Sequence, residues 1–223
     1  LSFDGTDDFV EIAANSVLNP TGDYTVAAWF KQEGNNTADT WQSVMTSRSS
    51  SGTNAKGYMM YLNPTNNYLQ YWKGTNSGGS WVKNTTTSQS TWKSNGGGDP
   101  GTPGWNYYVI RFNGSNQTDL FLDGELIKTI TSSKIMNVQN TTRPTRIGAG
   151  ATENAGAQYF FKGKIDDVAV WDEALTDAEI YALYNSGETL YAKENYGDYS
   201  SKDNLVAYYT CLLYTSPSPR DAT

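Results

Sequence analysis

The sequence lacks histidine altogether and contains a single cysteine, Cys211, among its 223 residues. Histidine is the most frequent general base and metal ligand in proteins, so its absence excludes the Ser-His-Asp and Cys-His schemes of nucleophilic catalysis. A metal site built from this sequence would have to use oxygen ligands. Calcium is the ion that suits such a ligand set.

Charged residues and long apolar runs are also scarce. Aspartate, glutamate, lysine and arginine make up 17% of the chain, the formal net charge is −7, and no basic run occurs. Nucleic-acid-binding proteins show a basic patch or stripe, and a membrane-spanning helix needs roughly 20 consecutive apolar residues. We therefore expect neither a nucleic-acid partner nor insertion into a membrane.

Short apolar runs separated by turn residues dominate what is present, and they predict strands. In "YTVAAWFKQ", residues 24–32, both alternating faces are apolar. This strand is therefore predicted to be central and covered on each side. The runs "GYMMYLN" and "YLQYWKG" flank "NPTNN", whose proline and asparagines predict a hairpin.

Two dipeptides indicate tight turns further along the chain. Asn-Gly at 113–114 and Asp-Gly at 123–124 readily take the positive φ angles of hairpin turns. We expect three consecutive antiparallel strands, a meander, over residues 105–112, 118–122 and 125–131.

One helix is predicted, near residues 177–185. Thr176 and Glu179 have the spacing of a capping box, in which each side chain satisfies a free amide at the helix start. The apolar residues that follow lie on one face. Gly187 is predicted to end the helix in a left-handed conformation.

Five segments together carry a resemblance to a known family: "LSFDGTDDFVEI", "YTVAAWF", "WNYYVIRFNG", "LFLDGELI" and "FKGKIDDVAVWDEALTDAEIYALYN". In this order they resemble the laminin-G-like jelly-roll domain of the concanavalin A-like lectin/glucanase superfamily, over about residues 1–187. The resemblance implies an all-β fold, a two-sheet antiparallel jelly-roll sandwich. It also implies that Trp29, Trp105 and Trp171 occupy core positions.

The resemblance suggests how the chain divides. Residues 1–195 are expected to form the sandwich, and residues 196–210 a linker followed by a strand. That strand, within "DNLVAYYT", resembles the opening strand that family members carry ahead of the position of Leu1. It either closes this sandwich or opens a second copy, the alternative that we favour. The final segment, 211–223, resembles a translated sequencing adapter and is predicted to be a non-native tail.

Relatives with the same fold include glycoside hydrolases whose strand motif E-x-D-x-x-E supplies two catalytic carboxyls. The nearest segment here is "KIDDVAVWDE", with Lys164 where a nucleophile would be required. Asp166 and Asp167 are adjacent on a predicted strand and should face opposite sides of the sheet, whereas retaining hydrolysis needs carboxyls about 5–5.5 Å apart. We therefore predict that the protein is not an enzyme.

The same relatives suggest a metal site and a sugar site. Asp166 aligns with an aspartate that binds a structural calcium ion in the glucanases; the alternative is that Asp166 forms a hydrogen bond to a neighbouring loop. Aromatic rings stack on sugars, and Trp72, Trp81 and Trp92 lie in or beside the long polar stretch 73–104. Together with Tyr71 they are the predicted ligand-binding residues; local packing within the loop is the alternative.

Two functions remain open on this reading. The first is a non-catalytic carbohydrate-binding module of a larger extracellular or surface protein, with a polysaccharide or glycoconjugate as partner and further domains beside it. The second is a structural or adhesion repeat of a cell-surface or virion-surface protein, with no glycan ligand.

Overall fold

The fold was obtained as a computed structural model. It describes residues 1–18, 21–33, 41–49, 56–62, 104–114, 116–131, 143–151, 156–185 and 191–210, and the backbone alone of residues 69–73 and 82–85. Trp81, Trp92 and the predicted tail 211–223 lie outside the described residues. No helix in the described part of the chain is long and apolar enough to cross a membrane.

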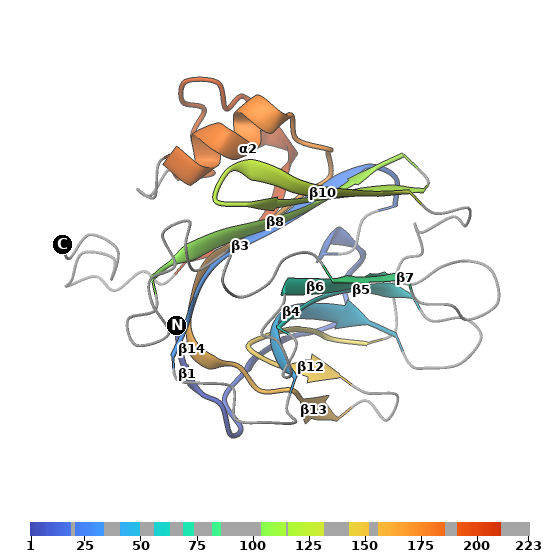
Figure 1. The fold of residues 1–223 in the computed structure, drawn as a ribbon, viewed down its shortest axis with the longest axis vertical. Helices are drawn as coiled ribbons and strands as arrows, with labels where there is room; N and C mark the ends of the chain where they lie inside the picture. Colours follow the sequence, from blue (N-terminus) through green and yellow to red (C-terminus); the bar gives the residue numbers. More distant parts are fainter. Residues whose placement is uncertain are drawn as a thin grey trace.

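The described strands form two antiparallel sheets that lie face to face, with a helix above one of them (Figure 1). Sheet A has the order β1 (Ser2–Asp4), β14 (Lys162–Trp171), β3 (Tyr24–Gln32), β8 (Asn106–Asn113), β9 (Gln117–Leu122) and β10 (Glu125–Thr131), and β15 (Leu205–Tyr209) pairs with β14. Sheet B has the order β2 (Val10–Ile12), β11 (Thr145–Ile147), β4 (Gln42–Arg48), β5 (Gly57–Leu62), β6 (Leu69–Lys73) and β7 (Val82–Thr85). The prediction of an all-β two-sheet sandwich is confirmed.

Smaller elements connect and cover the sheets. A two-stranded ribbon of β12 (Gly150–Ala151) and β13 (Ala157–Gln158) lies beside β4, below sheet B in Figure 1. The remaining elements are the 3-10 turns η1 (Ser16–Leu18) and η4 (Lys202–Asn204) and the helix α2 (Asp177–Tyr184). The predicted hairpin of β5 and β6 and the predicted meander of β8, β9 and β10 are both confirmed.

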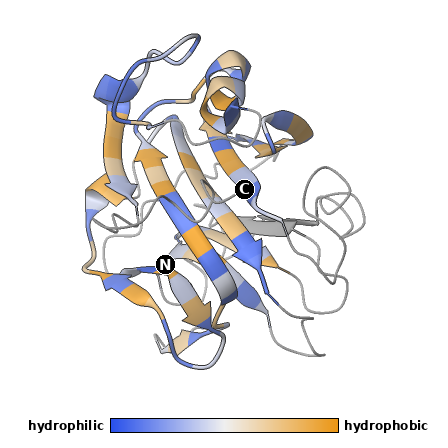
Figure 2. Ribbon diagram, turned by 90° about the vertical axis from the view of Figure 1, so that its left-hand side faces the viewer, coloured by the Kyte–Doolittle hydropathy of each residue, from blue (hydrophilic) through white to orange (hydrophobic). Residues whose placement is uncertain are grey.

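The strand β3 is central, as its sequence predicted, because it pairs with β14 on one side and β8 on the other. Its residues Val26, Ala28 and Phe30 join the core between the sheets. Ala27 and Trp29 face the opposite way, into a second apolar cluster. Figure 2 shows where apolar and polar residues follow one another along the strands of the sandwich. Full burial of a side chain of the size of Val26 or Phe30 contributes about 1.5–3 kcal/mol to stability.

The second cluster lies on the outer face of sheet A, under α2 and the segment 191–210. Trp171 is fully buried there, and its Nε1–H donates to the hydroxyl of Tyr199 at 2.9 Å. That hydroxyl in turn donates to the carbonyl of Ala192 at 2.7 Å. Trp29 and Trp171 are thus core residues, as expected, and Trp105 packs against the same cluster.

The helix α2 begins with the predicted capping box. The side chain of Thr176 accepts from the backbone N–H of Glu179, and the carboxylate of Glu179 accepts from the backbone N–H of Thr176. Glu179 also accepts hydrogen bonds from Ser201 at 2.6 Å and from Ser200, so it ties the helix to the C-terminal segment. Asn185, with φ of 45°, is the left-handed residue at the helix end; the prediction had given that place to Gly187, which lies outside the described residues.

One edge of β14 is shared by two strands that are far apart in sequence. The first residues of β14, 162–164, pair with β1, and its last residues, 168–171, pair with β15. The backbones of Leu1 and Ile165 hydrogen-bond each other between them. β15 therefore extends sheet A. Of the two alternatives for residues 203–210, a strand that closes this sandwich would occupy this position.

Candidate functional site

The outer face of sheet B carries the candidate site. Directly paired residues of an antiparallel sheet point to the same face. Met45 pairs with Met60, and both belong to the core, whereas Thr46 pairs with Met59 and Ser43 with Tyr61 on the opposite face. A bulge between Ser43 and Met45 sets which residues of β4 reach that outer face.

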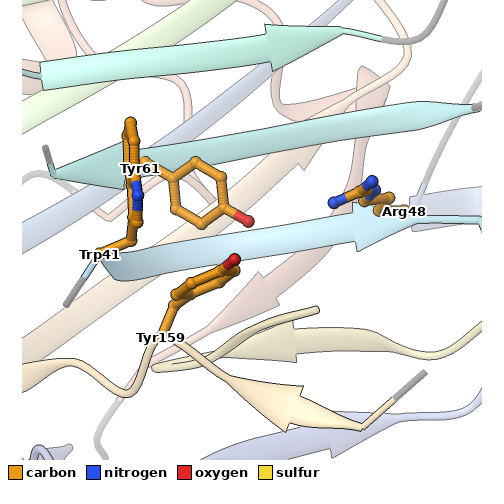
Figure 3. Close-up of a pocket in the computed structure, with 4 residues that line it drawn as sticks. All are labelled: Trp41, Arg48, Tyr61 and Tyr159. Atoms are coloured by element: carbon orange, nitrogen blue, oxygen red, sulfur yellow. The ribbon is translucent and has the colours of Figure 1, made fainter. Parts of the chain in front are cut away.

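A pocket of about 80 Å³ opens on this face. Four described residues line it: Trp41 just before β4, Arg48 at the end of β4, Tyr61 on β5, and Tyr159 after β13. Figure 3 shows Trp41 at one end and Arg48 at the other, with the two tyrosine rings between them. The ring centroid of Tyr61 lies 5.7 Å from that of Trp41 and 5.6 Å from that of Tyr159. The described lining is thus aromatic at one end and carries a guanidinium at the other.

Backbone geometry holds Tyr159 in place. Its φ is 56°, a left-handed conformation that a bulky side chain rarely adopts and that costs of order 1–3 kcal/mol. Its carbonyl accepts a 2.9 Å hydrogen bond from the backbone N–H of Ser43. Opposite the ring stands Gly150, where an added Cβ would lie 2.8 Å from Tyr159 and 3.0 Å from Tyr61. The absence of a side chain at Gly150 is what leaves room for both tyrosines.

The guanidinium of Arg48 reaches the same sulfur atom as Tyr61. Arg48 Nη1 donates to Met59 Sδ at 3.9 Å, and the hydroxyl of Tyr61 donates to that sulfur at 3.0 Å. The residue across from Arg48 is Gly57, whose φ of 91° and close approach to the backbone of β4 exclude a side chain. The residue paired with Arg48 therefore places no side chain directly across from it.

Two of the four predicted sugar-binding residues lie on a described strand. Tyr71 and Trp72 belong to β6, the strand next to β5, and their Cα partners there are Met60 and Met59. Trp81 and Trp92 fall outside the described residues. That these four bind a ligand stays a prediction.

The sequence analysis did not single out Trp41, Arg48 or Tyr159. Tyr159 lies more than a hundred residues after Trp41 and Arg48, and no local motif joins the three. Two weak signals were present: an aromatic residue at the edge of a polar loop, Trp41, and the glycine at position 150 that faces the tyrosines. Neither points to a site until the sheet register is known.

The adjacent acids of β14 depart from simple alternation. We expected Asp166 and Asp167 on opposite faces of the sheet. Instead the pairing of β14 with β3 is interrupted between Asp166 and Ala169, and Asp167 has a φ of 44°. Asp167 lines a space of about 10 Å³ together with Trp29 and other residues of the cluster under α2. A regular period of two therefore cannot be applied across this bulge.

Among the described residues, Asp166 belongs to no cluster of three acidic side chains. Asp166 is buried, and its Oδ1 accepts a 2.9 Å hydrogen bond from the backbone N–H of Asp167. The one described group of three acids with oxygens within 4.8 Å of one another is Asp4, Asp7 and Asp8, which are exposed. A structural calcium ion at Asp166 stays a prediction.

Two packed antiparallel sheets, a helix over one outer face and an aromatic pocket on the other define a jelly-roll module of the lectin-like class. The chain belongs to the concanavalin A-like lectin/glucanases superfamily: residues 4–181 match its Laminin_G_3 family model. The resemblance inferred from the sequence is thereby confirmed. No curated protein sequence matches the chain.

Several solved structures share the fold. The binding domain of Paraclostridial Mosquitocidal Protein 1 superposes with a TM-score of 0.61 at 17% identity, over 83% of this chain and 42% of that one. The CBM40 of the Ruminococcus gnavus IT-sialidase, bound to α2,3-sialyllactose, gives 0.56 at 14% identity, over 80% and 97%. Domain 4 of AbnA, a GH43 extracellular arabinanase from Geobacillus stearothermophilus, in complex with arabinotriose, gives 0.56 at 17% identity, over 82% and 75%. At these identities the likeness concerns the fold alone.

Proposed function

We propose that this chain is a non-catalytic, lectin-like module that binds carbohydrate in the pocket of Trp41, Arg48, Tyr61 and Tyr159. The observation that carries the proposal is the pocket itself. Sugar-binding sites combine aromatic faces, which pack on the C–H groups of a sugar ring, with a few polar groups that fix its hydroxyls. Here three rings supply the faces, and two hydroxyls and a guanidinium supply the polar contacts.

The size of the pocket bears on the kind of ligand. A cavity needs about 10–15 Å³ to hold one water molecule, whereas sites for drug-sized ligands have about 300–1,000 Å³. The 80 Å³ bounded by the described residues suits one sugar unit better than a long stretch of polysaccharide. We therefore favour a terminal or branching sugar as the bound unit.

The absence of catalysis is part of the proposal. Retaining and inverting glycoside hydrolysis both require a pair of carboxyl groups that flank the scissile bond. The described lining of the pocket contains no aspartate or glutamate. The described lining can pack against a sugar but offers no carboxyl group to protonate a leaving oxygen or attack the anomeric carbon.

The structural neighbours add support of a weaker kind. Two of them were solved with a sugar ligand, arabinotriose or α2,3-sialyllactose. Because a shared fold does not by itself determine function, these cases show only that such a sandwich can carry a sugar site. An extracellular or surface location, with other domains in the same protein, fits this role and belongs to the proposal.

Binding of the 223-residue chain to a panel of immobilised polysaccharides and glycoconjugates tests the proposal. Tyr159→Ala should abolish the binding shown by wild type, because it removes one wall of the pocket. Tyr181→Ala serves as the matched control, since Tyr181 is an exposed tyrosine on α2, across sheet A from the pocket. Circular dichroism and thermal unfolding establish that each variant is folded.

Three outcomes would count against the proposal in different ways. No binding by folded wild type would favour the structural or adhesion repeat. Binding that survives Tyr159→Ala but is lost on combined alanine substitution of Trp72, Trp81 and Trp92 would move the site to the predicted residues. Loss of binding in a chelator would revive the calcium site at Asp166.

A further inference from the structure

The two strands that share one edge of β14 lie end to end along it. Both β15 and β1 run antiparallel to β14, and Tyr209 near the end of β15 is the Cα partner of Val168. Leu1 and Ile165 exchange two backbone hydrogen bonds, of 2.9 and 3.0 Å. Only two positions of β14 lie between Val168 and Ile165. β15 therefore occupies a length of the β14 edge that is bounded at one end by the start of β1.

The short strand β15 contributes to both apolar clusters of the module. Val206, Ala207 and Tyr209 pack against the core between the sheets, and Leu205 and Tyr208 pack against the cluster under α2. The residues of β14 that pair with this strand, 168–171, are at most 2% exposed. Removal of β15 would uncover apolar side chains on both faces and would leave an unpaired strand edge, the kind of surface that recruits another strand. This stretch of β14 therefore has the properties of a strand-binding site.

A short, exposed connection attaches β15 to the rest of the module. Ser201, just before it, is held by Glu179 at 2.6 Å. The next residues, Lys202 and Asp203, are exposed and belong to the 3-10 turn η4, which leads directly into β15. A 3-10 turn rises about 2.0 Å per residue and a strand about 3.3 Å, so extension of η4 would carry β15 away from its own edge. An identical element on such a hinge can be exchanged between two copies of a chain at low cost, because every contact is remade.

We propose that the edge of β14 over residues 168–171 is a strand-binding site and that two copies of this chain associate by exchanging β15. In the pair, β15 of each copy lies on β14 of the other, in the register seen here within one copy. An incoming strand has to present apolar side chains to both clusters in this register, and the same strand of a second copy meets that requirement by construction. The exchange uses no residue of the proposed sugar pocket, which lies on the outer face of sheet B. A pair would carry two such pockets and would bind multivalent glycans with increased avidity.

Disulfide cross-linking between two variants of the full chain tests the exchange. Cys211, the only cysteine of the sequence, is removed from every variant by Cys211→Ser. Val170 and Ala207 are Cα partners, and the Cβ atoms of such partners lie about 4.5–5.5 Å apart, close to the separation that a disulfide spans. Val170→Cys is mixed with Ala207→Cys at increasing concentrations and then oxidised, so that a bond between the chains requires β15 of one on β14 of the other. The control mixes Val168→Cys with Leu205→Cys, which lie on the same two strands but out of register.

The pair in register should give at least about tenfold more disulfide between chains than the control, because a disulfide tolerates little error in distance. Analytical ultracentrifugation of wild type should show a dimer whose fraction rises with protein concentration. The double variant Val170→Cys/Ala207→Cys, oxidised at low concentration, should close within one chain and then stay monomeric where its reduced form dimerises. A synthetic peptide with the sequence of residues 203–210 should lower the dimer fraction, and a scrambled peptide of the same composition should not.

Wild type that stays monomeric at every concentration up to its solubility limit overturns the exchange. A dimer that forms equally well from the oxidised double variant uses another surface and overturns it too. Equal competition by the scrambled peptide would show an edge that accepts any extended chain, which contradicts the choice of a second copy as the partner. If Val170→Cys does not fold, Ala169→Cys and Tyr208→Cys, the neighbouring Cα partners, test the same register. All of these results are independent of glycan binding, so they leave the proposed sugar site to its own test.

Discussion

Replacement of Asp123 by asparagine should stabilise the fold at neutral pH. Asp123 and Gly124 form the two-residue turn between β9 and β10, with φ of 51° and 82°, and asparagine adopts such angles readily. Asp123 Oδ1 accepts a 2.8 Å hydrogen bond from the backbone N–H of Tyr107, which an asparagine oxygen preserves. Oδ2 is buried and accepts no hydrogen bond from the described residues.

The pKa of Asp123 gives the magnitude. Burial raises this pKa from 3.8 to about 7, an effect opposed by the hydrogen bond from Tyr107 and increased by the charge of Glu125. Because the native state holds the proton more tightly than the unfolded chain, stability falls as the pH rises from about 4 to about 7, and is level above that. At 1.36 kcal/mol per pKa unit, the ionised carboxylate costs the native state up to about 4 kcal/mol.

Asparagine removes that cost but introduces one of its own. Its side chain is neutral at every pH, yet an NH₂ group replaces the buried Oδ2, and an amide without an acceptor costs about 1–3 kcal/mol. We expect Asp123→Asn to raise the free energy of unfolding by about 1–3 kcal/mol near pH 8. Near pH 4, where the wild-type carboxyl is protonated, the gain should vanish or reverse.

Urea unfolding followed by tryptophan fluorescence, at about pH 4, 6 and 8, measures these free energies. Asp198→Asn is the control, because it makes the same chemical change at an exposed position of the C-terminal segment. The reasoning is refuted if Asp123→Asn is no more stable than wild type near pH 8. It is also refuted if the stability difference between the two proteins is the same at all three pH values.

Three further predictions concern the C-terminal segment and the pocket. Tyr199→Phe should lower the free energy of unfolding by about 1–3 kcal/mol, because it removes the hydroxyl that accepts from Trp171 Nε1; a loss below about 0.5 kcal/mol, typical of a surface change, would contradict this. Burial tends to raise the pKa of Glu179, but its hydrogen bonds outweigh that effect and lower it, so the carboxylate stabilises the fold at neutral pH and less as the pH falls through the native pKa. Glu179→Gln should therefore destabilise the protein at about pH 7 and less at about pH 3, and a constant difference in thermal unfolding would argue against this. Gly150→Ala should weaken glycan binding at least about tenfold, since the added Cβ would crowd the ring of Tyr159; unchanged affinity would show that the tyrosines do not form the binding wall.

Local sequence signals predicted the regular elements well where the physical cause is itself local. Residues 24–32 predicted a central strand, because both faces of that strand are apolar and both had to be covered. The spacing of Thr176 and Glu179 predicted the helix start, because a capping box needs only those two residues and the backbone between them. The dipeptide Asp123-Gly124 predicted its turn through the φ angles that these residues tolerate.

Predictions that depended on one residue of register were less secure. Adjacent positions 166 and 167 were assigned to opposite faces, but the bulge in β14 inserts a residue and breaks the period. The left-handed residue at the end of α2 is Asn185 instead of the glycine two positions later. Both outcomes depend on how the element packs against its neighbours, which short-range preferences do not specify.

The sequence by itself determined the class of fold, the central strand, the meander and the capped helix, because each follows from patterning or turn chemistry within a few residues. Only the tertiary structure decided the candidate site. Trp41, Arg48, Tyr61 and Tyr159 come together because β4 pairs with β5 in one register, a bulge at Ser43 sets the face, and the chain beyond β13 turns Tyr159 back onto Gly150. Contacts between segments so distant in sequence arise from sheet pairing and packing, and no local pattern encodes them.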